Sequence, residues 1–265
     1  MTPPGQLPGG LPEVVASRPL GGGSIADVYL ARLTDGRDVV VKHGPTPAGL
    51  EAEGLTALAA AGAPVPAVLA HAGGTLVLEY LDGPRGDRRE LGRSLAAIHR
   101  HLGARFGWHR DNVIGSLPQA NPPSDHWPTF LAEARLGPYL GDLPVELARR
   151  LDAAIADGRL AALADHDVVP SLVHGDLWSG NVLADRWLLD PAVHHADREV
   201  DLAMLALFGS VGAALHAGYA EVWPLDDGWE RRLPLLQLPP LLVHVRLFGA
   251  SYLGGVAARL DQLGW

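Results

Sequence analysis

Short runs of alternating apolar and polar residues occupy the first third of the chain, a pattern typical of antiparallel strands. Strands are expected from Leu20 to Lys42, where a glycine cluster and an Asp-Gly turn separate the runs. The runs 67–70 and 75–81 flank two further glycines and predict a second strand pair. Residues 1–12 are rich in proline and glycine and are expected to form a loose arm.

Other segments have the three- to four-residue apolar period of a helix. Residues 48–61 are one such segment, and a stripe after residue 88 consists of Leu91, Leu95, Ile98 and Leu102. Residues 146–165 form another helical segment. Residues 233–250 are the most apolar, but prolines, a histidine and an arginine interrupt them too often for a membrane span. This last segment is therefore expected to be a buried helix.

Composition and charge narrow the class of protein. The 265 residues suffice for one large core or two lobes, and the formal charge of −9 argues against nucleic acid or an anionic membrane as a partner. The chain has no cysteine, which excludes disulfides and fits a cytoplasmic protein. No basic segment or apolar run precedes Arg18, so no signal peptide is expected.

The clearest chemistry lies in His-Gly-Asp-Leu-Trp-Ser-Gly-Asn at residues 174–181, followed by Leu-Asp-Pro around Asp190. Phosphoryl transfer needs a carboxylate that accepts the proton of a hydroxyl. It also needs oxygen ligands that hold Mg²⁺ against the phosphates of ATP. The spacing therefore predicts Asp176 as the catalytic base, and Asn181 and Asp190 as Mg²⁺ ligands.

The order of the predicted elements indicates an α+β protein with two lobes. A small β-rich N-terminal lobe, residues 1–82, is followed by a larger helical lobe, residues 83–265. The catalytic motif lies in the second lobe among short predicted strands at 171–174, 181–183 and 187–189. Only helices are expected after these strands.

Around this motif the chain resembles the fructosamine kinase (ketosamine-3-kinase) family, within the small-molecule kinases similar to aminoglycoside phosphotransferases and choline kinase. The resemblance rests on the catalytic motif together with 106–108, 111–116, 190–192, 197–204 and 247–252. It implies a protein-kinase-like bilobal fold with ATP and Mg²⁺ as cofactors. It also implies phosphoryl transfer to O3 of a free or protein-linked ketosamine, such as fructosyl-lysine or ribulosyl-lysine, in protein deglycation.

In the first lobe a glycine turn, a strand-end lysine and a following helix fit the parts of a kinase that bind ATP. By resemblance, the phosphates are covered by Gly22, Gly23 and Ser24. Adenine is expected at the end of the last strand, beside Glu79, Tyr80 and Leu81. Lys42 follows a β-branched run and is the sole lysine of the chain. Its partner is Glu51 or Glu53, which lie on different faces of the helix, and Glu51 matches the family better.

Several residues of the second lobe have more than one interpretation. By position alone, Trp178 beside Asp176 is a core residue or a wall of the acceptor pocket, and the family pattern favours the pocket. Glu199 forms a local ion pair with Arg198 or binds the acceptor, and the resemblance adds Asp197 to the acceptor side. Structural support of the catalytic loop is expected from His174 and Asp201.

A kinase acting on a ketosamine is therefore the leading hypothesis. Another small-molecule kinase of the same fold, acting on an aminoglycoside, choline or homoserine, is the first alternative, and the motifs that flank the catalytic segment argue against it. A non-catalytic nucleotide-binding scaffold is the second alternative. The presence of Lys42, Asp176, Asn181 and Asp190 argues against a scaffold.

Overall fold

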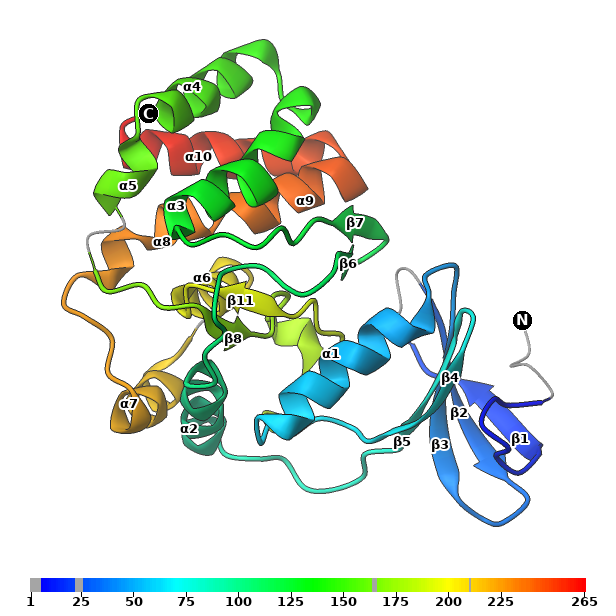
Figure 1. The fold of residues 1–265 in the computed structure, drawn as a ribbon. Helices are drawn as coiled ribbons and strands as arrows, with labels where there is room; N and C mark the ends of the chain where they lie inside the picture. The colour runs from blue at the N-terminus through cyan, green and yellow to red at the C-terminus, as the bar shows by residue number, and fades with distance from the viewer. Residues whose placement is uncertain (1–5, 22–25, 164–165, 210) are drawn as a thin grey trace.

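An antiparallel sheet begins the fold, and a mostly helical part follows it (Figure 1). The computed structural model describes residues 6–21, 26–163, 166–209 and 211–265. The sheet has the strand order β1-β2-β3-β5-β4, and every neighbouring pair is antiparallel. Its strands are β1 (Val14–Pro19), β2 (Asp27–Leu33), β3 (Asp38–His43), β4 (Val68–Ala72) and β5 (Thr75–Glu79).

Both faces of this sheet bury apolar side chains, because successive residues of a strand point to opposite sides. On one face Val41 and Val77 pack with Leu7, which precedes β1. On the other face Leu76 packs against Leu55 of helix α1 (Ala48–Ala60). Leu7 is only 4% exposed. The prediction of a loose arm is therefore wrong at Leu7, which is held on the sheet although no strand forms there.

The helical part contains the helices after α1 and three separate strand pairs. The helices are α2 (Arg88–His99), α3 (Trp127–Phe130), α4 (Val145–Ala156), α5 (Arg159–Leu163), α6 (Glu199–Leu207), α7 (Ala213–Val222), α8 (Leu233–Leu236), α9 (Leu238–Phe248) and α10 (Leu253–Leu263). Short π or 3-10 turns are η1 (Leu131–Leu136), η2 (Gly137–Asp142), η3 (Ser179–Asn181), η4 (Trp229–Arg231) and η5 (Ala250–Tyr252). The strand pairs are β6 (Asn112–Ile114) with β7 (Leu117–Gln119), β8 (Ser171–Val173) with β11 (His194–Ala196), and β9 (Val182–Leu183) with β10 (Trp187–Leu188).

The predicted strands are confirmed in outline and wrong in detail. The first strand, β1, ends before the glycine cluster, whereas the pattern placed it from Leu20 onward. Strands β6 and β7 lie in a region read as having no strand, and β11 contradicts the expectation that only helices follow the catalytic strands. Each of these three strands has only three residues, and so short a run carries no measurable apolar period.

The predicted helices are also confirmed with corrections. Leu102 is exposed, because α2 ends at His99 before the stripe reaches it. The segment 146–165 divides into α4 and α5 around Gly158, whose φ is +70°. The apolar segment 233–250 divides into α8 and α9. Across the described ranges, no helix combines the length and apolar character needed to span a membrane.

Helices α2 and α7 cross at close range because each contributes a glycine to the contact. A Cβ on Gly92 would collide with the carbonyl oxygen of Leu215, and a Cβ on Gly218 would collide with that of Arg89. Around this crossing, Leu95 of α2 packs in the same cluster as Leu215, Leu172 of β8 and Leu177, which lies in the predicted catalytic loop at residues 174–181. The glycine contact therefore sets the position of α2 relative to the loop.

Gly218→Ala is expected to lower the free energy of unfolding by about 1–3 kcal/mol, the usual cost of forcing extra volume into a packed contact. Urea denaturation followed by far-UV circular dichroism measures the change. Gly254→Ala is the matched control, because a Cβ at this α10 position meets no atom within 4 Å. The control is expected to be neutral or to stabilise by up to about 1 kcal/mol. Equal effects of the two variants would contradict the close helix crossing.

Candidate active site

The catalytic loop, residues 174–181, leads from β8 to β9 and makes a close approach to the segment after Asp190. Gly175 has φ +80°, and a Cβ there would collide with the carbonyl oxygen of Ala192, so glycine is required at this point. At the end of the loop, Asn181 Nδ2 donates to the backbone oxygen of Asp176 at 2.9 Å and to its Oδ2 at 3.1 Å. The structure therefore places the predicted base and the predicted amide ligand side by side.

Asp176 has an electrostatic environment that suits proton transfer. Burial and the nearby charge of Asp190 raise the pKa of Asp176 to about 7, against the opposing effect of the Asn181 hydrogen bond. A base works best when its pKa lies near the working pH, because it is then partly ionised and still binds the proton well. The neighbouring carboxylate thus contributes to the proton affinity of Asp176.

Lys42 on β3 connects the sheet to the segment that carries Asp190. Its Nζ donates to Glu51 Oε1 on α1 at 2.7 Å and also to the Asp190 carboxylate. Although burial raises the pKa of Asp190, the Lys42 ammonium lowers it below its ordinary value. Asp190 itself has φ +55°, a left-handed conformation that is uncommon outside glycine. The predicted lysine, helix glutamate and second Mg²⁺ ligand therefore meet at one point.

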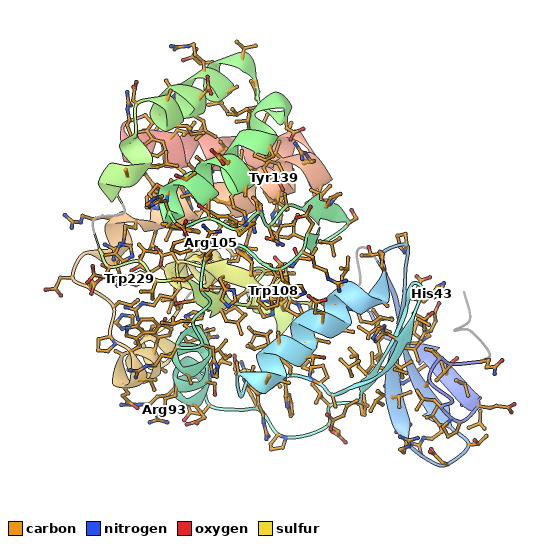
Figure 2. The ribbon with its side chains drawn as sticks, viewed as in Figure 1. His43, Arg93, Arg105, Trp108, Tyr139 and Trp229 are labelled. Atoms are coloured by element: carbon orange, nitrogen blue, oxygen red, sulfur yellow. The ribbon has the colours of Figure 1, made fainter. Side chains whose placement is uncertain are left out.

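Glu53 faces a different part of the molecule. It accepts a hydrogen bond from Trp108 Nε1 at 2.8 Å, lies 3.1 Å from His109 Nε2 and pairs with Arg110. Figure 2 shows Trp108 on the helical side of α1. The glutamate that contacts Lys42 is therefore Glu51, while Glu53 attaches the same helix to the helical part.

Asp201 on α6 holds the catalytic loop from behind. Its carboxylate accepts the backbone N–H groups of His174 at 2.8 Å and Gly175 at 2.9 Å. His99 of α2, which the sequence did not single out, lies 3.1 Å from the same carboxylate and 2.7 Å from the hydroxyl of Tyr219. All three side chains are at most 1% exposed. A histidine inside an apolar helix stripe was the only sequence signal for His99.

His174 has the contacts of a structural residue. Its Nε2 lies 2.9 Å from the backbone oxygen of Leu189, the residue before Asp190. Burial lowers the pKa of the His174 ring. A neutral, buried ring that bonds a backbone carbonyl connects the catalytic loop to the Asp190 segment, and it is poorly suited to act as the base.

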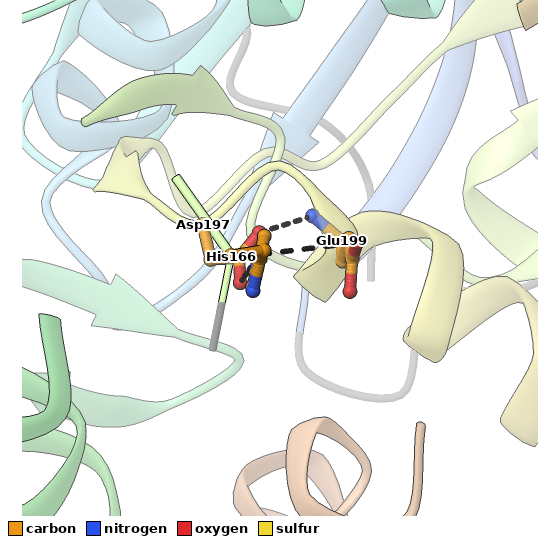
Figure 3. A group of neighbouring side chains, drawn as sticks. All are labelled: His166, Asp197 and Glu199. Carbon is orange, nitrogen blue, oxygen red and sulfur yellow. Dashed lines mark hydrogen bonds and ion pairs between the residues drawn. The ribbon is translucent and has the colours of Figure 1, made fainter. Parts of the chain in front are cut away.

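A separate buried group contains Asp197 and Glu199, the two residues expected on the acceptor side (Figure 3). His166 Nε2 lies 3.2 Å from Asp197 Oδ2 and 3.9 Å from Glu199 Oε1, a spacing compatible with a bound cation. Arg232, however, donates to both Glu199 oxygens, at 2.8 and 2.7 Å. Its guanidinium already supplies positive charge, so the geometry indicates a buried ion-pair network rather than a metal site or an acceptor-binding pair.

The alternative of a local Arg198–Glu199 ion pair is wrong. Arg198 instead donates to the backbone oxygens of Trp223 and Pro224 at 2.9 and 2.7 Å, and Glu199 pairs with Arg232. Neighbouring positions on the first turn of α6 point in different directions, and only the packing of distant segments supplies their partners. No pattern in the sequence singled out Arg232.

The remaining predicted residues lie at the edges of the site. Trp178 is 41% exposed and its ring covers Gly180, so it is not a core residue. Glu79 ends β5, its carboxylate accepts the N–H of Ala67 at 3.2 Å, and the next residues in the chain are Tyr80 and Leu81. The predicted phosphate-covering residues lie outside the described residues, namely Gly22, Gly23 and Ser24.

These features are typical of a kinase of the protein-kinase-like fold. The sheet is small and antiparallel, a lysine pairs with a helix glutamate, and an Asp-Asn loop faces a second aspartate. Solved phosphotransferases and kinases with less than 25% identity share this fold, a likeness that concerns the fold alone. The family model for fructosamine kinase matches residues 8–264, so the chain belongs to the fructosamine kinase family.

Individual relatives agree with this membership. A probable ketoamine kinase of Synechocystis sp. is 41% identical over 231 residues, which are 80% of this chain and 77% of the relative. The chloroplastic protein-ribulosamine 3-kinase of Arabidopsis thaliana is 36% identical over 207 residues, 72% of this chain and 62% of the relative. A crystal structure assigned as fructosamine-3-kinase from Thermobifida fusca superposes with a TM-score of 0.86 at 39% identity, over 95% of this chain and 94% of the other.

Asp201→Asn is expected to lower the free energy of unfolding at pH 7 by about 2–4 kcal/mol, because buried hydrogen bonds to a charged acceptor are lost. Although burial raises the pKa of Asp201, bonds from His99 and the backbone of His174 lower it below its ordinary value. A depressed folded-state pKa gives stability that is complete above the unfolded pKa and is lost as pH falls through the folded pKa.

The difference between wild type and Asp201→Asn should therefore stay constant from about pH 7 to 5 and shrink below about pH 4. Urea denaturation at a series of pH values measures it. A difference that grows as the pH falls would contradict an ionised Asp201 in the folded protein.

Proposed function

We propose that this chain is an ATP-dependent kinase that phosphorylates O3 of a ketosamine, such as fructosyl-lysine or ribulosyl-lysine, free or attached to protein. The observation that carries the proposal is the bond between Lys42 and Asp190, beside the loop that carries Asp176. The names of the relatives, ketoamine kinase and protein-ribulosamine 3-kinase, support the acceptor class. Phosphorylation of such an adduct fits a role in protein deglycation.

The residues at the site fit a nucleotide with Mg²⁺. Asp190 and Asn181 offer carboxylate and amide oxygens, which are the ligands that Mg²⁺ prefers. The nitrogen of the Asn181 amide donates to Asp176, and its oxygen carries the electron pairs that a cation can share. Bound Mg²⁺ and ATP supply the transferable phosphoryl group and neutralise the charge that develops on it.

Asp176 accepts the proton of the acceptor hydroxyl as the new bond to phosphorus forms. The bond that breaks joins the terminal phosphorus to the bridging oxygen, so ADP leaves with that oxygen and the proton remains on Asp176. Asp201 and His99 hold the catalytic loop, so the carboxylate of Asp176 does not have to be reoriented during the reaction. The catalytic work of the protein is positioning and charge stabilisation.

The first lobe, residues 1–82, binds the nucleotide in this proposal, and residues 83–265 form the catalytic lobe. Lys42, held by Glu51, contacts the phosphates, and the glycine turn that contains Gly22, Gly23 and Ser24 covers them. Backbone groups near Glu79, Tyr80 and Leu81 bind adenine. The hydrogen bond between Lys42 and Glu51 supports the first of these roles, because it orients the ammonium before ATP arrives.

Trp178 forms a wall of the acceptor pocket in this proposal. It lies two residues after Asp176 and is partly exposed, so its ring is accessible to a substrate whose hydroxyl meets the base. The secondary amine of a ketosamine is cationic near neutral pH, and the face of an indole attracts a cation. Asp197 and Glu199 are left out of this pocket, because Arg232 and His166 occupy their carboxylates.

Asp176→Asn is expected to lower kcat by about 10²- to 10⁴-fold and to leave ATP affinity unchanged, because the general base is lost. ADP release is measured with fructosyl-lysine, ribulosyl-lysine and kanamycin as acceptors, with and without Mg²⁺. Asp38→Asn is the matched control, since Asp38 forms its ion pair with Arg32 on the sheet. A wild type that phosphorylates only kanamycin would overturn the acceptor class. A variant with wild-type kcat would remove Asp176 from the mechanism.

Trp178→Ala is expected to raise KM for the ketosamine by roughly two- to thirtyfold, which corresponds to a cation–π contact of about 0.5–2 kcal/mol. KM for ATP should hardly change. Trp178→Phe keeps an aromatic face and should show a smaller rise. Equal shifts of both KM values in Trp178→Ala would indicate a general effect on the loop and contradict a pocket wall.

A further inference from the structure

Four polar residues are buried together where the β6–β7 hairpin meets the η1 segment. They are Asn112, Gln119, Asn121 and Arg135, all of them at most 9% exposed, and they are called the amide cluster below. Asn112 and Gln119 face each other across the hairpin, because their positions pair in register. The function described so far does not use any of them.

The amide cluster is joined by its own hydrogen bonds. Asn112 Oδ1 accepts from Gln119 Nε2 and from Asn121 Nδ2, each at 2.9 Å. Arg135 Nη2 donates to Asn121 Oδ1 at 2.6 Å, and Arg135 Nη1 donates to the backbone oxygen of Ala120 at 2.6 Å. Each amide therefore has its orientation set by another member of the cluster.

The amide cluster also donates hydrogen bonds to two backbone carbonyl groups of the segment that carries Asp190. Asn112 Nδ2 donates to the oxygen of Val193 at 2.8 Å, and Gln119 Nε2 donates to the oxygen of Ala192 at 3.3 Å. These carbonyls lie two and three positions after Asp190 in the chain. The amide cluster thus contacts the Asp190 segment by directional bonds, not only by packing.

Two other parts of the molecule, the catalytic loop and helix α1, contact the same segment. The N–H of Ala192 donates to the oxygen of His174 at 2.9 Å, and Gly175 makes its close approach to the oxygen of Ala192. On the α1 side, a Cβ on Gly54 would stand 3.1 Å from Pro191 Cγ. A left-handed Asp190 persists only when its surroundings hold it, and the amide cluster adds two directional bonds to those that the catalytic loop makes.

Stability alone is a poor explanation for the amide cluster. Burial lowers the pKa of Arg135 to about 9, which shows how unfavourable this environment is for its charge. Well-packed apolar residues often replace a buried charge without loss of stability. What this polar network adds is a single geometry, because its hydrogen bonds have fixed directions.

We propose that the amide cluster positions Asp190 for metal binding, so that Asn112, Gln119, Asn121 and Arg135 are positioning residues of the kinase reaction. The proposal rests on the function proposed above, in which Asp190 is a Mg²⁺ ligand. The bonds of Asn112 and Gln119 to Val193 and Ala192 are the direct link, and Asn121 and Arg135 orient them.

Gln119→Met tests this link, because it keeps a similar length and removes the donor that Ala192 and Asn112 share. Asn112→Asp is the second variant, since it keeps the acceptor oxygen and loses the donor to Val193. Each variant is expected to raise the Mg²⁺ concentration for half-maximal activity by about tenfold, the effect of losing one buried hydrogen bond. KM for the ketosamine should stay within about twofold, because the bonds that are removed run to Ala192 and Val193 and not to Trp178.

Hydrogen exchange gives a readout without nucleotide or metal. The amide of Ala192 should exchange about tenfold faster in each variant than in the wild type, because the carbonyl beside it is released. Leu260→Ala is the control for general destabilisation, since Leu260 is a buried residue of α10 in the helical part. It should unfold more easily but keep the wild-type Mg²⁺ requirement and the wild-type exchange of Ala192.

The two levels of the proposal fail separately. If Gln119→Met and Asn112→Asp match Leu260→Ala in both Mg²⁺ requirement and Ala192 exchange, the positioning role is overturned while the kinase function stands. If the wild type transfers phosphate to no ketosamine, or does so without Mg²⁺, the proposed function fails. In that case faster Ala192 exchange would still support a link between the cluster and this segment, and unchanged exchange would overturn it.

Discussion

The arrangement of the site depends on the two ion pairs that Lys42 makes with Glu51 and Asp190. One cation from the sheet binds a carboxylate of α1 and a carboxylate of the loop that faces the catalytic segment. The side chain of Lys42 is only 14% exposed, and its single positive charge faces two carboxylates, so the loss of Lys42 would leave two like charges side by side. Because Lys42 is the sole lysine of the chain, no other ammonium side chain could replace it.

Around this ion pair the catalytic loop is held by buried polar groups rather than by apolar packing alone. Asp201, which contacts His99, accepts a hydrogen bond from the backbone of the catalytic loop. The amide cluster donates to a backbone carbonyl of the Asp190 segment. Such groups contribute little net stability, because they lose water when they are buried. Their benefit is geometric, since hydrogen bonds fix directions that apolar contacts leave free.

The exposed part of the site has a different character. Trp178 is accessible on the loop, whereas the carboxylates of Asp197 and Glu199 are enclosed by His166 and Arg232. In the proposed mechanism the reaction chemistry depends on residues of a kind that phosphoryl transfer requires in any kinase. Of these, Asn181 is buried, Asp176 is partly buried and Asp190 is exposed. In the proposed function, recognition of the acceptor depends on the accessible side chain of Trp178, where a change of residue would alter the substrate at little cost to the fold.

Local signals in the sequence determined the α+β order of elements and the helix at 48–60, because spacing along the chain carries this information. The same spacing predicted Asp176, Asn181 and Asp190 as the catalytic set. Tertiary structure alone decided that Glu51 contacts Lys42 while Glu53 turns to Trp108, and that Glu199 pairs with Arg232. It also decided that His99 supports the loop and that three-residue strands form the hairpin of the amide cluster. These contacts join residues far apart in the chain. Only the packing of whole elements brings such residues together, and no local period records it.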